Sequence, residues 1–138
     1  MKSTPFDPEK DFAPIPLDKN MRQLAQELKS HGLVWQPQVG SFVWDPENTI
    51  PVPSPFPDRI YFVLNLNHFL KILGSIERMQ EKLVWLPSWQ QARQICLTLD
   101  IPHSQIQEKL RDNSIWSAQQ ETRVLYELIL EKLKAVRV

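Results

Sequence analysis

The fold of this chain is decided by Pro51-Val-Pro-Ser-Pro-Phe-Pro57 and by the run that follows it, Arg59-Ile-Tyr-Phe-Val-Leu64. Prolines fix φ and lack a backbone N–H, so the first segment is predicted to be an extended, non-helical strip on the surface of one domain. The second segment is β-branched and aromatic throughout, which favours a strand. Because it is almost continuously apolar, we expect a central strand that is covered on both faces.

On the N-terminal side of this stretch, the pattern predicts one helix and one hairpin. Asp18 is a suitable cap for a helix over residues 19–31, and Gly32 follows where a left-handed residue commonly ends a helix. The two arms of the hairpin are residues 33–36 and 41–44, joined by a turn that Gly40 allows. In that pairing one face would carry Leu33, Trp35, Phe42 and Trp44.

On the C-terminal side, cap residues and apolar periodicity predict a mostly helical half. Asn65 and Ser75 are suitable caps for two short helices, and residues 83–86 form a short apolar strand that Pro87 ends. Three Ser-x-x-Gln capping boxes follow. They lie at Ser88/Gln91, Ser104/Gln107 and Ser117/Gln120, and the helices are expected at 89–99, 105–112 and 118–136.

These elements together predict an α/β domain of the α+β type. Its sheet is expected to have three or four strands, antiparallel or mixed, with helices covering it and a long helix at the C-terminus. Residues 18–138 form the single globular domain, and residues 1–17 form an extended proline-rich arm.

Composition argues against several classes of partner. The 138 residues carry 16 Lys and Arg against 16 Asp and Glu, so the chain lacks the positive charge that nucleic-acid binding needs. Neither nucleic acid nor a membrane is an expected partner, and no apolar signal or spanning segment is visible. A single cysteine fits a reducing compartment, and we expect a cytoplasmic protein whose oligomeric state the sequence leaves open.

No catalytic or metal-binding motif stands out. His31, His68 and His103 are not spaced from one another or from Cys96 as zinc ligands are, and each lies at a helix end, in a helix or in a turn. Cys96 lies between two aliphatic residues on a predicted helix, which is typical of a small buried hydrophobe. We therefore expect no catalytic residues, no metal and no cofactor, and no enzyme.

Aromatic residues at the edges of the predicted elements are the candidate partner-binding residues. They are Trp44 before a turn, Phe56 in the proline strip, Trp89 at the start of a helix and Trp116 before a cap. Partly exposed aromatic rings beside a rigid proline strip are typical of a protein-binding surface. They could equally plug the ends of a small core, and the sequence leaves both interpretations open. Trp35 and Trp85, inside predicted strands, are interpreted as core residues.

Two runs carry a resemblance to a known family. Arg59-Ile-Tyr-Phe-Val-Leu-Asn-Leu-Asn-His-Phe-Leu70 and Glu81-Lys-Leu-Val-Trp-Leu-Pro-Ser-Trp-Gln-Gln-Ala-Arg93 resemble a family of small cyanobacterial proteins related to carboxysome shell-assembly chaperones. The similarity covers about residues 18 to 100. It implies a cytosolic, non-catalytic accessory protein that binds a segment of a carboxysome shell subunit and prevents its premature association.

The expected function is therefore a protein-binding module that holds a tail segment of its partner in an aromatic and aliphatic groove. Two alternatives remain open. A small-ligand sensor would need a closed apolar cavity without catalytic groups. A small hydrolase or transferase would need a deep pocket that joins His68, His103 or Cys96 to acidic residues.

Overall fold

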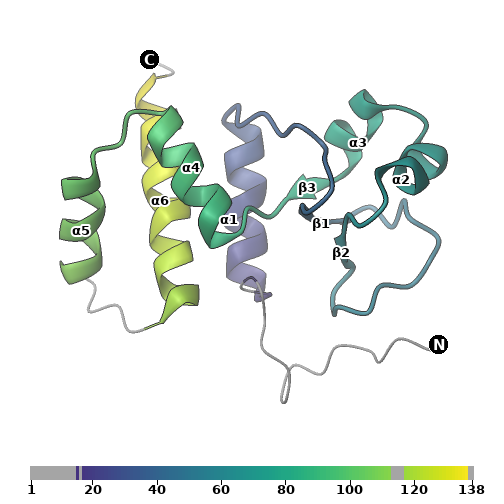
Figure 1. Ribbon diagram of the computed structural model, residues 1–138, viewed down its shortest axis with the longest axis horizontal. Helices are drawn as coiled ribbons and strands as arrows, with labels where there is room; N and C mark the ends of the chain where they lie inside the picture. Colours follow the sequence, from purple (N-terminus) through teal and green to yellow (C-terminus); the bar gives the residue numbers. More distant parts are fainter. Residues whose placement is uncertain (1–14, 16, 113–116, 137–138) are drawn as a thin grey trace.

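A small antiparallel sheet lies between two groups of helices (Figure 1). The computed structural model describes residue 15, residues 17–112 and residues 117–136. The two shortest of the six described helices lie on one side of the sheet, and the other four lie on the opposite side. The elements in chain order are α1 (Lys19–Ser30), β1 (Phe42–Trp44), β2 (Ile60–Phe62), α2 (Leu66–Leu73), α3 (Ile76–Lys82), β3 (Val84–Trp85), α4 (Trp89–Thr98), α5 (His103–Asp112) and α6 (Ala118–Val136).

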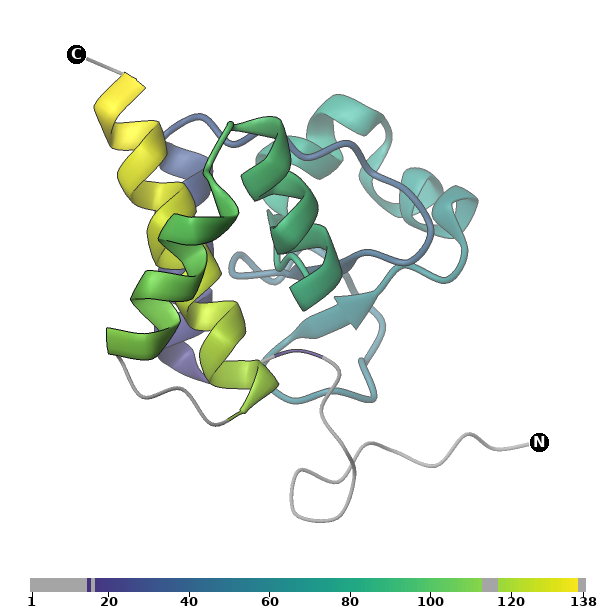
Figure 2. The ribbon, with the colours of Figure 1, turned by 60° about the vertical axis from the view of Figure 1, so that its left-hand side comes forward.

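This architecture confirms the predicted α+β fold, the three-stranded sheet and the long C-terminal helix. Figure 2 shows α6 beside α4, α5 and α1 on one side of the molecule. Tyr126, in the middle of α6, is fully buried and donates a hydrogen bond from its hydroxyl to the carbonyl of Pro87, at 2.5 Å. That bond fixes α6 against the short connection between β3 and α4. None of the helices in the part of the chain that the structure describes combines the length and the apolarity needed to cross a bilayer.

The alternation of side chains along the strands creates two cores, one on each face of the sheet. Residues 42, 60, 84 and 86 face the four-helix side and join the cluster built by α1, α4, α5 and α6. Residues 43, 61 and 63 face α2 and α3 and join a second cluster. Ile15 is buried in the first cluster, and Leu17 packs against it, so described residues on the N-terminal side of residue 18 contribute to this core. Residues 1–14 lie outside the described residues.

The order of the strands is β2-β1-β3, so the predicted central position of the strand after the proline strip is wrong. β2 is an edge strand, although it is covered on both faces, with Ile60 in the first cluster and Tyr61 in the second. The central strand is β1, where Val43 lies opposite both Tyr61 and Trp85. The apolar run correctly indicated burial of both faces, but burial does not determine how many neighbours a strand has.

The predicted hairpin between residues 33–36 and 41–44 is also wrong. β1 pairs with β2 and β3 instead, and residues 33–36 are extended without belonging to the sheet. Consequently the four residues predicted to share a face do not. Trp35 is buried in the second cluster, whereas Leu33 and Trp44 pack against the first cluster, to which Phe42 belongs. β1 pairs with strands that lie far from it in the sequence, and a local turn pattern cannot predict such pairing.

Most helix starts follow their predicted caps. Asp18, Asn65, Ser75 and Ser88 each accept a hydrogen bond from a backbone N–H in the first helical turn, and Ser88 forms a complete capping box with Gln91. Ser104 does not act as a cap, because α5 already begins at His103.

A Schellman motif ends α1 and sets the direction in which the chain leaves the helix. Gly32, with φ of 97°, donates to the carbonyl of Lys29, and Leu33 donates to the carbonyl of Leu28 at 2.9 Å. The extended segment 32–38 starts from this fixed point. Its course is fixed a second time at Trp35, whose carbonyl accepts a hydrogen bond from Gln80 Nε2 at 2.6 Å.

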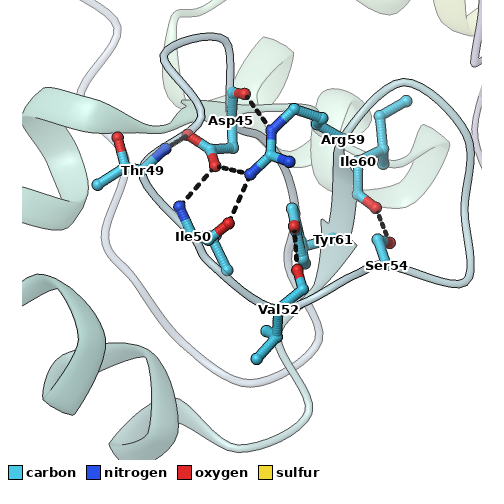
Figure 3. A network of polar contacts seen from close by, with 8 residues as sticks. All are labelled: Asp45, Thr49, Ile50, Val52, Ser54, Arg59, Ile60 and Tyr61. Atoms are coloured by element: carbon cyan, nitrogen blue, oxygen red, sulfur yellow. Dashed lines mark hydrogen bonds and ion pairs between the residues drawn. The ribbon is translucent and has the colours of Figure 1, made fainter.

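A buried carboxylate holds the proline strip against the sheet (Figure 3). Asp45 is fully buried and accepts hydrogen bonds from the backbone amides of Thr49, at 2.9 Å, and Ile50, at 2.8 Å. Arg59 donates to the same carboxylate at 2.6 Å and to the carbonyl of Ile50 at 2.6 Å. The strip is therefore bound to the residues before and after it by backbone groups as well as by side chains.

Strand β2 fixes the middle of the proline strip. The Tyr61 hydroxyl donates to the carbonyl of Val52 at 2.5 Å, and the Ser54 hydroxyl donates to the carbonyl of Ile60 (Figure 3). The prolines remove backbone donors from this strip, so most of its bonds to the sheet use its carbonyls as acceptors. The strip is non-helical, as the sequence predicts, but the chain bends at residue 52 and at residues 55–57, so the strip is not extended throughout.

Acid is expected to weaken this network. Burial raises the pKa of the Asp45 carboxyl, but the hydrogen bonds from Arg59, Ile50 and Thr49 and the charge of Arg59 outweigh burial, so the pKa is lowered. The resulting stabilisation is complete above about pH 4, the pKa in the unfolded chain, and is lost as the pH falls through the lowered folded pKa. Thermal melts across this range should show a smaller acid dependence for Asp45→Asn than for the wild type. Equal acid dependence would contradict this assignment.

Candidate functional site

Two adjoining cavities form the candidate site, which we call the Trp85 groove. The larger has a volume of about 440 Å³ and the smaller about 260 Å³. Both are lined by Gly32, Leu33, Val34 and Trp85. A ligand that contacts Trp85 can therefore extend into either space.

The walls of the larger cavity come from distant parts of the chain. One wall is the segment 32–38, fixed by the Schellman motif and by Gln80 as described above. Residues of α4 and Leu133 of α6 also line this cavity. The aliphatic lining residues are Leu33, Val34, Ile95, Leu99 and Leu133, and the polar ones are Gln36, Gln38, Gln91, Gln94 and Thr98.

The polar lining of the larger cavity is uncharged. Four of its side chains are glutamine amides, each of which can donate and accept hydrogen bonds. Gln91 already uses its carbonyl oxygen to accept from the Ser88 amide, at 2.9 Å. An apolar surface with several amides suits a ligand that is itself uncharged and carries both donors and acceptors.

The smaller cavity contains the one charged residue among the described residues that line the groove, Lys29. Its ammonium donates to the carbonyls of Glu81, at 2.6 Å, and Leu83, at 3.1 Å. Burial lowers the pKa of Lys29 and outweighs the opposing effect of Glu47 and Glu81. Lys29 therefore ties the end of α1 to the start of β3 and shapes this cavity.

The groove is also bordered by an exposed aliphatic side chain. Val34 is 77% exposed although it lines both cavities, because it stands on the rim of the segment 32–38. A valine in this position loses its contact with water only when something else covers the groove.

The predicted partner-binding residues lie elsewhere, and the structure gives each a different environment. Trp44 is half-buried, and the guanidinium of Arg22 lies 5.5 Å from its ring. Trp89 is 41% exposed at the start of α4, where Arg93 lies 5.8 Å from its ring. Neither lines the Trp85 groove, and Trp116 lies outside the described residues. The groove itself is lined by Trp85, which the sequence analysis interpreted as a core residue.

Phe56 packs against the core rather than standing free. Its ring meets that of Phe42 edge to face, with centroids 5.7 Å apart, and it contacts the first cluster. We expect Phe56→Ala to lower the free energy of unfolding by about 2 kcal/mol, less than for a fully buried phenylalanine because the ring is half-buried. Chemical denaturation measures this loss. An unchanged stability combined with weaker partner binding would restore Phe56 as a binding residue.

The groups considered for catalysis are dispersed. His31 is paired with the carbonyl of Glu27, and His103 lies 3.1 Å from Arg93. Cys96 is buried in the first cluster, and burial raises the pKa of its thiol. Within residues 15, 17–112 and 117–136, no group of three or more His, Cys, Asp and Glu side chains could hold a metal ion.

Comparison with known proteins adds no relative: no protein family, no curated protein and no solved structure matches this chain.

Proposed function

We propose that this protein is a non-catalytic binding module that holds a segment of another protein in the Trp85 groove. The observation that carries the proposal is the composition of the larger cavity, which combines an aliphatic and indole surface with four glutamine amides and no charge among its described lining residues. Apolar area supplies the free energy of association, and the amides supply hydrogen-bonding partners for a polypeptide. Because the groove is open to solvent, a polypeptide segment can bind in it and dissociate from it.

The sequence resemblance supplies one partner class for this proposal, a tail segment of a carboxysome shell subunit. In that role the protein would be a cytoplasmic assembly chaperone that covers the tail until the shell forms. The uncharged lining of the larger cavity supports a role of this kind because its surface fits an apolar segment that would otherwise associate too early.

The test is affinity capture with three baits: the wild type, Thr98→Arg and Gln90→Arg. Thr98 lines the groove, whereas Gln90 is exposed on the same helix and does not line it, so it is the matched control. Both positions are exposed, and both variants should fold. A lysate of the source organism is passed over each bait, and the retained proteins are identified by mass spectrometry.

We expect a partner that the wild type and Gln90→Arg retain and that Thr98→Arg loses. With the purified partner, calorimetry should show that Thr98→Arg weakens binding at least about tenfold, or about 1.4 kcal/mol, because an arginine side chain occupies the cavity and buries a charge. Equal binding by all three proteins, or no retained protein, would contradict the proposal.

A further inference from the structure

On the side of β3 that faces away from β1, Trp85 is the residue, within the described part of the chain, whose backbone hydrogen bonds are unmade. In an antiparallel pair, hydrogen-bonded and non-hydrogen-bonded residue pairs alternate along the strands. Leu86 donates to the carbonyl of Phe42 at 2.9 Å, so it belongs to a hydrogen-bonded pair. Trp85, opposite Val43, belongs to a non-hydrogen-bonded pair. Its N–H and C=O therefore point away from β1, toward the edge of the sheet.

The two neighbouring residues on that edge already have partners. The carbonyl of Leu83 accepts from Lys29 at 3.1 Å, and its N–H donates to Met79 at 3.0 Å. The carbonyl of Pro87 accepts from Tyr126, and proline has no N–H. Across the described part of the chain, no hydrogen bond is recorded for the outward N–H and C=O of Trp85. One backbone donor and one backbone acceptor therefore remain on Trp85, which lines both cavities. Its indole Nε1 is also buried without a hydrogen-bond partner among the residues that the structure describes.

That pair of groups is what an additional strand requires. A residue of an extended peptide can exchange two hydrogen bonds with Trp85, accepting from its N–H and donating to its C=O. Because such bonds replace bonds to water, their net contribution is modest, so the pair sets the position of the peptide and apolar contacts supply most of its affinity. The aliphatic residues of the groove wall provide those contacts.

The walls restrict the chemistry of the peptide. A charged side chain in the larger cavity would meet no opposite charge among the described lining residues and would lose its hydration. The glutamine amides can bond the outer backbone edge of the peptide, which the sheet does not reach. Since side chains alternate along a strand, one apolar side chain can enter the smaller cavity beside Leu33 and Trp35.

We infer that the occupant of the Trp85 groove is an extended, uncharged peptide segment of another protein that pairs as an added strand with the backbone of Trp85. This inference rests on the proposed function and specifies how the groove recognises its partner. It distinguishes the groove from one that receives an amphipathic helix, whose backbone groups are already bonded internally and would leave Trp85 unpaired.

The test uses peptides selected from a phage-displayed library of random 12-residue sequences on the full-length protein. The best peptide is synthesised and added to ¹⁵N-labelled protein, and amide hydrogen exchange is followed by NMR. We expect exchange at the Trp85 amide to slow at least about tenfold as it gains a partner. The Leu86 amide, which is already bonded to Phe42, is the internal control and should change much less.

N-methylation of the peptide, one amide at a time, provides a second readout. Added-strand pairing predicts that methylation abolishes binding at the one peptide amide that donates to the Trp85 carbonyl, and has a smaller effect at the amides on either side, which point away from β3. The selected sequences should also lack charge in the part that responds to methylation.

The outcomes separate this inference from the function it rests on. Peptides that Thr98→Arg no longer binds, but that leave Trp85 exchange unchanged and contain no single methylation-sensitive amide, would overturn the added strand and keep the groove. Peptides that bind Thr98→Arg as well as the wild type, or a selection that yields no binder, would overturn the proposed function itself.

Discussion

Replacing Asp45 by alanine should lower the free energy of unfolding by about 3 kcal/mol. The change removes the acceptor for the Thr49 and Ile50 amides and the partner of Arg59. The Ile50 amide is buried, so its lost hydrogen bond leaves an unsatisfied donor, which costs more than the bond itself contributed. The Arg59 side chain is 35% exposed, so water can hydrate its guanidinium once the carboxylate is gone. The loss of unfolding free energy should therefore be smaller than for a fully buried ion pair.

Glu47→Ala is the matched control for this change. Glu47 lies two residues away and pairs with Lys82 at 3.8 Å, but its side chain is 57% exposed. Its removal should cost less than about 1 kcal/mol. Urea denaturation of both variants measures the difference. If the two variants proved equally stable, the buried network would not be what holds the proline strip.

Replacing Trp85 by alanine should weaken partner binding by about 2 to 4 kcal/mol, a loss of about 30- to 1,000-fold in affinity. Trp85 lines both cavities, so the loss of its indole removes apolar contact surface next to each. The same ring packs against the second core cluster, and the variant is therefore also expected to be less stable. Binding is measured well below the melting temperature of the variant, with circular dichroism to confirm its fold.

Trp89→Ala separates two explanations of the binding surface. The groove proposal expects almost no effect, because Trp89 lines neither cavity. The sequence-based prediction of an aromatic patch at the element edges expects a loss of about 1 to 4 kcal/mol instead. A partner that tolerates Trp85→Ala but not Trp89→Ala would favour the patch over the groove.

The sequence predicts those parts of the fold that depend on neighbouring residues. Asp18, Asn65, Ser75 and Ser88 cap helices because their side chains reach N–H groups only a few residues ahead. The prediction of a cap at Ser104 was wrong, because the helix after Pro102 begins one residue earlier, at His103.

The sheet depends on contacts between distant residues, and the prediction was weaker there. The turn before β1 suggested a hairpin with residues 33–36, but β1 is central and takes its partners from residues 60–62 and 84–85. Residues 33–36 instead form a wall of the groove. No local pattern distinguishes an extended wall from an extended strand, since both consist of similar apolar residues.

The groove could not be predicted for the same reason. Its lining residues come from α1, the segment 32–38, α3, β3, α4 and α6, and only the fold brings them together. The sequence analysis selected aromatic residues by their positions at element ends. That criterion missed Trp85, which lies inside a strand and still lines the groove because β3 is at the edge of the sheet. Whether a strand lies at the edge depends on the order of the strands in the sheet, which the sequence does not show.

The most direct test of the central claim is site-specific photo-cross-linking of the bound partner. A benzoylphenylalanine is introduced in place of Val34, on the rim of the groove, or in place of Leu97, which is similarly exposed at 68% but does not line the groove. The account predicts that irradiation joins the partner to position 34 and not to position 97, and that the cross-linked peptide is an uncharged segment. Cross-links from position 97, with none from position 34, would contradict it.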